Sequence, residues 1–275
     1  MQRKLSLITT ILSIAVSLNI YGQEILLHRA HAHNDYENPR PLKDAIELGF
    51  ASIEVDVHLI GKDLYVSHKR PLVRNKTKTL RKLYLDPLKS IYDQNNGRIY
   101  KDPKSPLYLM IDIKSENEKS YVVLKEQLEE YKELLKPKKG TPAVVVYLSG
   151  NRPLHSVMYD GQRLASIDGR PEDLQTNYAN SFMPIISQDY RKILGWSGHG
   201  DIPSKDMKAI SDLVDRVHDQ NKKLRLWGVP EQPQVWEALL TVGVDFISTD
   251  KLQNFHNFLK MKREENLARF HTEKK

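Results

Sequence analysis

Two acidic residues two positions apart, Glu54 and Asp56, stand inside the apolar run ASIEVDV at residues 51–57. Side chains alternate between the two faces of a β-strand, so these carboxylates share one face while Ile53 and Val55 share the other. Like charges this close disfavour each other's ionised form unless a positive group joins them. The pair therefore requires either a divalent cation or an ion pair with a nearby Lys or Arg.

A third acidic residue lies in the run LYLMIDIK at residues 107–114. The same alternation places Asp112 and Lys114 on the inward face of the next predicted strand. Oxygen ligands favour a hard cation, and the chain has no cysteine, so we expect one Mg²⁺ or Ca²⁺ at Glu54, Asp56 and Asp112. Lys114 is expected either to hold one of these carboxylates or to bind negative charge on a substrate.

Four histidines lie near these carboxylates in the sequence. His28, His31 and His33 cluster at the end of the first predicted strand, and His68 follows Glu54 by fourteen residues. Two imidazoles beside a metal-bound phosphate can serve as general acid and general base. We predict that His33 and His68 form this pair, with His31 as the next choice for the first position. The sequence leaves the choice among the three clustered histidines to geometry. The predicted contacts to substrate are His31, Asn34, Lys114 and Trp227.

Apolar, β-branched runs alternate with amphipathic stretches along the chain. The predicted strands are 24–30, 51–57, 107–113, 143–148, 163–167, 182–187, 223–229 and 244–249. The predicted helices are 41–49, 79–95, 117–136, 152–160, 171–180, 203–220, 231–242 and 251–268. Eight such units favour an α/β fold, a closed (β/α)8 TIM barrel with its site at the carboxyl ends of the strands. A doubly wound open sheet is the alternative, although no Gly-rich phosphate fingerprint follows any strand. We expect a single barrel domain over residues 24–275.

Positive charge is unevenly distributed in a chain whose net charge is +7. Residues 69–104 contain eleven Lys or Arg and only three Asp. This segment is either a solvated loop or a positive rim that attracts an anionic substrate or an anionic lipid surface. Nucleic acid is disfavoured as a partner because no recognition helix, zinc site or aromatic stacking platform accompanies the charge.

The first 23 residues combine a basic start, Arg3 and Lys4, with an apolar run at residues 5–20. This pattern predicts a secretory signal peptide and hence a periplasmic or extracellular protein. A membrane anchor is the alternative, but the continuously apolar part is shorter than the ~20 residues that a spanning helix needs.

Taken together, these residues resemble the phosphodiesterase superfamily that includes phosphatidylinositol-specific phospholipase C, glycerophosphodiester phosphodiesterases and spider-type sphingomyelinase D. The shared elements are a His after strand one, the E-x-D of IEVDV, a second His and a later acidic residue in IDIKS: here His33, Glu54 with Asp56, His68, and Asp112. The ending RLWGVPEQPQVWEALLTVGVDFISTDKL also resembles the last two strands of glycerophosphodiester phosphodiesterases, so the resemblance covers most of residues 24–260. The motif HAHNDY looks most similar to a little-characterised bacterial branch of this PI-PLC-like superfamily.

The resemblance implies a barrel with one Mg²⁺ or Ca²⁺ at its mouth and two histidines acting on a phosphodiester. A cyclic phosphate is formed in such enzymes when a neighbouring substrate hydroxyl attacks. The chain departs from the glycerol-type pattern, with HRAHAHNDYEN around the first His and Lys69 after the second. We therefore expect a phosphoric diester hydrolase for a small anionic phosphodiester, either a glycerophosphodiester or a phospholipid head group. We expect it to act as a monomer, with peripheral membrane contact an open option.

Two other functions fit parts of this pattern. The first is a metal-dependent amidohydrolase, because H-x-H after the first barrel strand is also that superfamily's metal pair. It would require further His ligands on strands five and six, which RLASIDG and FMPIIS lack. The second is a non-catalytic barrel that binds a phosphate or lipid group.

Overall fold

The computed structural model describes residues 27–102 and 105–272, in which nine strands form one sheet. The predicted signal peptide at residues 1–23 lies outside this part. The strands are β1 (Leu27–Ala32), β2 (Phe50–Ile60), β3 (Asp63–Val66), β4 (Leu107–Ile113), β5 (Val144–Gly150), β6 (Ala165–Gly169), β7 (Ile185–Asp189), β8 (Lys223–Trp227) and β9 (Phe246–Thr249). All eight predicted strands are present, and β3 adds a hairpin partner to β2.

Eight of these strands close into a parallel barrel. The pairing order runs from β1 through β9, β8, β7, β6, β5 and β4 to β2, and β1 also pairs with β2 in parallel. Because β1 has a neighbour on both sides, the sheet has no gap, and the open doubly wound alternative is wrong. β3 lies outside the barrel, antiparallel to the end of β2. The predicted (β/α)8 barrel is therefore confirmed.

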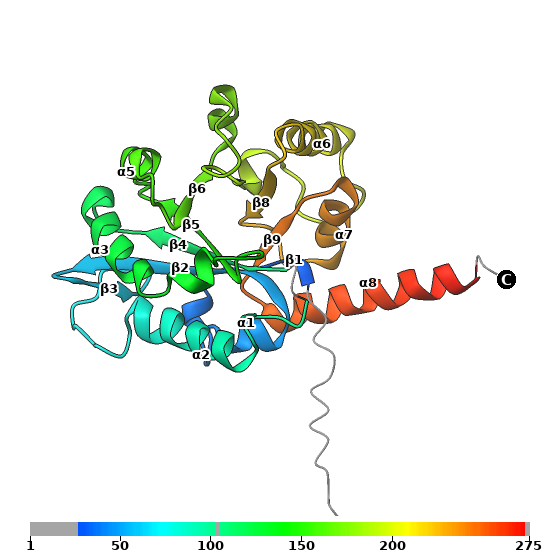
Figure 1. The fold of residues 1–275 in the computed structure, drawn as a ribbon. Helices are drawn as coiled ribbons and strands as arrows, with labels where there is room; N and C mark the ends of the chain where they lie inside the picture. The colour runs from blue at the N-terminus through cyan, green and yellow to red at the C-terminus, as the bar shows by residue number, and fades with distance from the viewer. Residues whose placement is uncertain (1–26, 103–104, 273–275) are drawn as a thin grey trace, which may run out of the picture.

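Helices cover the outside of the barrel, and the last one extends away from it (Figure 1). The α-helices are α1 (Lys43–Glu47), α2 (Asp86–Gln94), α3 (Asn117–Glu129), α4 (Lys132–Leu135), α5 (Leu154–Tyr159), α6 (Ser204–His218), α7 (Pro233–Val242) and α8 (Leu252–Thr272). Short irregular helices are η1 (Asp35–Glu37), η2 (Arg81–Leu85), η3 (Pro171–Thr176) and η4 (Tyr190–Lys192). The predicted helix at 117–136 is thus two helices, and the stretch at 171–180 is a single 3₁₀ segment.

The alternation of side chains in the strands produces two apolar regions. Ile53, Val55 and Val57 are completely buried between β2 and the surrounding helices, as their parity predicts. A smaller cluster that includes Met110 and Tyr147 forms inside the barrel from strand residues of the opposite parity. This inner cluster fills the barrel below the polar residues, so the charged side chains gather at its mouth.

The first strand ends later than predicted. β1 continues to Ala32 instead of stopping at residue 30, so His31 belongs to the strand. Its side chain is completely buried. A histidine in a loop after the strand would not need to be buried. His33 is the first residue beyond the strand, and Asn34 then turns the chain with a left-handed φ of 48°.

The turn from this motif to α1 contains backbone strain. Leu42 has φ 64° and ψ −49°, which is the uncommon γ-turn conformation, and Lys43 N donates to Pro41 O at 2.7 Å. The buried carboxylate of Asp35 accepts hydrogen bonds from Leu42 N at 2.6 Å and from Tyr84 Oη at 2.8 Å. Asp35 therefore holds the strained turn in place. Burial raises the pKa of Asp35 to about 6, although these hydrogen bonds oppose the rise.

We predict that Asp35→Asn removes a pH-dependent part of the stability. The folded protein holds the Asp35 proton more tightly than the unfolded chain, whose pKa is near the ordinary 3.8. The contribution is therefore complete below about pH 4 and is lost as the pH rises through about 6. Relative to the variant, the wild-type free energy of unfolding should fall by about 3 kcal/mol between about pH 4 and about pH 7. Urea unfolding at several pH values measures this; parallel curves for the two proteins would contradict it.

Candidate active site

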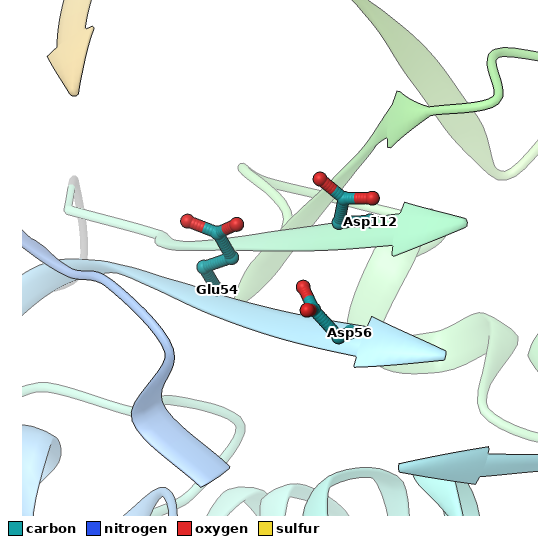
Figure 2. Close-up of side chains that lie close together, drawn as sticks. All are labelled: Glu54, Asp56 and Asp112. Atoms are coloured by element: carbon teal, nitrogen blue, oxygen red, sulfur yellow. The ribbon is translucent and has the colours of Figure 1, made fainter. Parts of the chain in front are cut away.

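Three carboxylates converge at the mouth of the barrel from two neighbouring strands. Glu54 and Asp56 point inward from β2, and Asp112 of β4 is the register partner of Asp56. One oxygen from each lies within 4.8 Å of the others (Figure 2). Gly150 at the end of β5 leaves room for this cluster, because a Cβ there would overlap Asp112 Oδ1. The predicted convergence of the three acidic residues is confirmed.

The oxygens of the acidic cluster are suited to a cation. Asp56 Oδ1 is buried and accepts no hydrogen bond from any residue in the described chain. Asp112 Oδ1 has only the ionic contact with Lys114 Nζ, at 3.1 Å. Burial, with the added charges of Glu54 and Asp56, raises the pKa of Asp112 to about 6 despite the opposing Lys114. A buried acidic triad with unpartnered oxygens could bind a divalent cation, which would relieve both the burial cost and the repulsion.

Two basic side chains also contact the acidic cluster. Arg225 Nη2 of β8 donates to Glu54 Oε2 at 2.7 Å, and both side chains are almost completely buried. Burial by itself would raise the pKa of Glu54, but the Arg225 charge, the hydrogen bond from His31 and the charges of His33 and His31 together outweigh it, and the pKa is about 2. Lys114 Nζ lies 3.3 Å from Asp56 Oδ2 and 3.1 Å from Asp112 Oδ1. The ion pairs expected as the alternative to a metal are therefore present, yet within residues 27–102 and 105–272 the three carboxylates have only these two Lys or Arg partners.

His31 lies behind Glu54 and does not reach the cavity. Its Nδ1 is 2.8 Å from Ser52 Oγ, and its Nε2 is 3.2 Å from Glu54 Oε2. Burial, aided by the Arg225 charge, lowers the pKa of His31 to about 3, so the ring is neutral near pH 7. With one ring proton, Nε2–H donates to the carboxylate and Nδ1 accepts from the serine hydroxyl. The predicted contact of His31 with substrate is therefore wrong: it is a positioning residue for Glu54.

His33 stands at the mouth of the barrel, where its side chain is 25% exposed. Its Nδ1 is 2.7 Å from Asp250 Oδ1, and its Nε2 is 3.8 Å from Glu54 Oε2. Burial by itself would lower the pKa of His33, but the hydrogen bond to Asp250 and the charge of Glu54 outweigh it, so the pKa is raised. His28 is exposed at the opposite end of β1. Of the three clustered histidines, His33 is the one that lines the cavity.

His68 faces the same cavity from the segment that follows β3. Its Nδ1 lies 3.0 Å from Asp56 Oδ2, and its side chain is 60% exposed. The same carboxylate oxygen accepts from Tyr36 Oη at 2.8 Å. In both predicted catalytic histidines Nδ1 therefore meets a carboxylate, and Nε2 forms no hydrogen bond with the described residues, although that of His33 lies 3.8 Å from Glu54 Oε2.

A cavity of about 380 Å³ joins these groups. Its lining includes seven of the predicted site residues, His33, Asn34, Glu54, His68, Asp112, Lys114 and Trp227. It also includes residues that were not predicted: Ser149, Gly150, Arg170, Arg191, Arg225 and Gly228. Asn34, Lys114 and Trp227 thus lie where substrate contacts were predicted. Whether they bind substrate stays a prediction.

A basic wall on the far side of the cavity was not predicted from the sequence. Asp168 of β6 is completely buried and accepts hydrogen bonds from Ser149 Oγ at 2.8 Å, Ser187 Oγ at 2.6 Å and Arg170 Nη1 at 2.7 Å. This network fixes Arg170 at the cavity wall. Arg225 could have been found from its strand, because it shares the inward face with Trp227 two residues later.

The closed barrel and its motif residues define a class of protein, the phosphodiesterase superfamily of PI-PLC and glycerophosphodiester phosphodiesterases. Within that class, residues 21–163 match the family of the AIM6-like phosphodiesterase domain, and the chain belongs to this family. Family membership and the buried position of His31 together count against the amidohydrolase alternative, which needs His31 and His33 as a metal pair.

Relatives of this chain occur in fungi. Altered inheritance of mitochondria protein 6 of Lachancea thermotolerans is 25% identical over 281 residues, covering 82% of this chain and 64% of its own length. The Saccharomyces cerevisiae protein of the same name is 28% identical, covering 81% of this chain and 68% of that protein. The Arthroderma benhamiae homolog is 26% identical over 80% of each chain. This chain therefore spans about two thirds of the length of the yeast proteins.

Solved structures with a similar fold include two bacterial glycerophosphodiester phosphodiesterases. The one from Parabacteroides distasonis has a TM-score of 0.51 and 17% identity, covering 86% of this chain and 98% of the other. The one from Agrobacterium tumefaciens has a TM-score of 0.50 and 11% identity, covering 85% and 100%. At these identities the likeness concerns the fold alone, and it agrees with the closed barrel described above.

The predicted periplasmic or extracellular location is wrong. The relatives are fungal proteins whose name refers to the inheritance of mitochondria, which does not agree with a bacterial exported protein. Within the described residues, no helix has the length and apolar character to cross a membrane.

We predict that Arg225→Met strongly destabilises the protein because it leaves the Glu54 charge buried without its strongest partner. Breaking a buried ion pair from one side costs about 3–5 kcal/mol. The double variant Glu54→Gln/Arg225→Met removes both charges and should recover most of this loss. Urea unfolding with a chelator present measures the three proteins. A loss below about 1 kcal/mol in the single variant, or no recovery in the double variant, would contradict the proposed balance of charges.

Proposed function

We propose that this protein is a metal-dependent phosphodiesterase with Glu54, Asp56 and Asp112 as metal ligands and His33 and His68 as the acid–base pair. The observation that carries the proposal is their arrangement around one cavity. A buried acidic triad with an unpartnered oxygen faces two histidines, and each histidine is hydrogen-bonded through Nδ1 to a carboxylate.

The three carboxylates would hold one Mg²⁺ or Ca²⁺, because their ligand atoms are all oxygens. When bound, this cation neutralises charge on the phosphate oxygens and makes the phosphorus easier to attack. The residues around it keep the ligands in place. Arg225 and His31 fix Glu54 Oε2, while Tyr36 fixes Asp56 Oδ2 and leaves Asp56 Oδ1 available.

The two histidines would move the protons. An imidazole whose Nδ1–H donates to a carboxylate keeps Nε2 for exchange with substrate, so Asp250 orients His33 and Asp56 orients His68. One Nε2 would accept the proton of the attacking hydroxyl, and the other would donate a proton to the leaving oxygen. The attacking group is either water, which yields an open phosphate monoester, or a neighbouring hydroxyl of the substrate, which yields a cyclic phosphate.

The cavity lining supports a small anionic substrate. Lys114, Arg170 and Arg225 place positive groups around the cavity, where they would bind the phosphate oxygens of a diester. Trp227 offers an apolar surface for one of the two alcohol groups. A volume of about 380 Å³ suits a glycerophosphodiester or a phospholipid head group. We expect a monomeric enzyme that does not act on nucleic acid.

We predict that the protein hydrolyses bis(p-nitrophenyl) phosphate and that a chelator abolishes the activity, with Mg²⁺ or Ca²⁺ restoring it. Loss of one acid–base group lowers kcat about 10²- to 10⁴-fold, so His33→Ala and His68→Ala should each fall in this range. His155→Ala is the matched control, because His155 is exposed on α5 away from the cavity. A panel of glycerophosphodiesters and lysophospholipids followed by ³¹P NMR separates cyclic from open products.

A complete lack of turnover across that panel, with both metals supplied, would overturn the enzymatic proposal. In that case, binding of an uncleaved diester detected by calorimetry would favour the alternative of a non-catalytic phosphate-binding barrel. If His68→Ala is as active as the wild type, His68 is not an acid–base group. The proposed metal ligands would then still be tested by the chelator experiment.

A further inference from the structure

The loop that follows His68 exposes two adjacent aliphatic side chains. Leu72 is 100% exposed and Val73 is 77% exposed. Single exposed apolar residues are ordinary on protein surfaces, but two neighbouring ones at the projecting end of a loop are unusual and often mark a contact surface. The loop lies on the side of the molecule opposite the projecting end of α8 (Figure 1).

The charged residues that flank this pair in the sequence are all positive. Residues 69–78, which we call the basic loop, contain five exposed cations and no acidic residue: Lys69, Arg70, Arg74, Lys76 and Lys78. Within the described chain, none of the five forms an ion pair with a carboxylate. By contrast, Arg81, Lys82 and Lys89 farther along are all paired with acidic side chains. The charge of the basic loop is therefore available to an external anion.

The basic loop has a defined shape. Val66 N donates to Lys78 O at 2.9 Å at its base, and Tyr65 forms an isolated antiparallel bridge with Thr79. Asn75 Oδ1 accepts from Thr77 N at 3.0 Å and from Thr77 Oγ1 at 2.7 Å, which organises the returning part of the loop. Folding therefore already orders much of the loop that presents Leu72 and Val73, so a contact made by these side chains costs less conformational entropy.

The basic loop also adjoins the candidate active site. An open hollow of about 900 Å³ lies between its base and the η1 segment, with Tyr36, Lys69, Lys78 and Leu83 in its lining. His68 lines both this hollow and the catalytic cavity. Anything that contacts the loop is thus brought beside a group that faces the cavity.

We propose that the basic loop docks the protein on a bilayer that contains anionic lipid. Leu72 and Val73 enter the interfacial region while the flanking Lys and Arg side chains contact lipid phosphates. The exposed apolar pair together with the flanking cations favours an anionic bilayer over other partners. Nucleic acid would use the positive charge but not two aliphatic side chains, whereas a lipid interface uses both, because its anchoring adds apolar burial to electrostatic attraction.

The test is sedimentation of the full chain with vesicles of phosphatidylcholine alone and of phosphatidylcholine mixed with phosphatidylserine. We expect the wild type to bind the anionic vesicles at least about tenfold more strongly, and added salt to weaken this binding. Leu72→Ser/Val73→Ser should reduce the binding about tenfold or more. Val122→Ser on α3, which is 56% exposed, is the matched control for loss of an exposed apolar group and should bind as the wild type does.

The charge is tested separately. Arg70→Gln/Arg74→Gln should weaken binding to anionic vesicles about tenfold or more. Lys138→Gln/Lys139→Gln removes two exposed cations before β5 and should have little effect. Two results would overturn the proposal. One is wild-type binding that is absent or equal on both vesicle types. The other is binding that Leu72→Ser/Val73→Ser leaves unchanged, which would indicate a general affinity for polyanions such as nucleic acid.

Discussion

The repulsion among three carboxylates at one end of the barrel is the constraint on which the rest of the site depends. Glu54 and Asp56 must point to the same face of β2, and register then places Asp112 beside them. Burial makes this costly, because water cannot screen the charges. The surrounding structure compensates for part of the cost through Arg225 and Lys114, but two fixed cations do not balance three acidic groups. A divalent cation completes the balance in our proposal.

Closure of the barrel brings the compensating groups into place. The acidic residues come from β2 and β4, whereas Arg225 comes from β8 on the other side of the barrel interior, 171 residues away in the chain. Arg170 is presented in the same way by Asp168 on β6. The cavity therefore has an acidic side that suits a cation and a basic side that suits a phosphate. All eight strands direct their carboxyl ends to the same mouth. The acidic residues of β2 and β4 therefore form one side of the cavity, and the basic residues at β6 and β8 form the other.

Much of this arrangement could be predicted from local patterns. The period of two in β2 and β4 was enough to place three carboxylates together, because neighbouring parallel strands keep their inward faces aligned. The mistake at His31 arose at an element boundary: β1 ends two residues later than predicted, and that difference places the ring behind Glu54. The Glu54–Arg225 pair depends on closure of the whole barrel, which no local pattern contains.

The central claim is that the acidic triad is a metal site and not a self-sufficient set of ion pairs. The most direct measurement is anomalous diffraction from crystals of the protein soaked with Mn²⁺, an oxygen-seeking substitute for Mg²⁺ or Ca²⁺. The account predicts one anomalous peak bonded to oxygens of Glu54, Asp56 and Asp112. The absence of a peak there, with Lys114 and Arg225 still paired to these carboxylates, would contradict it.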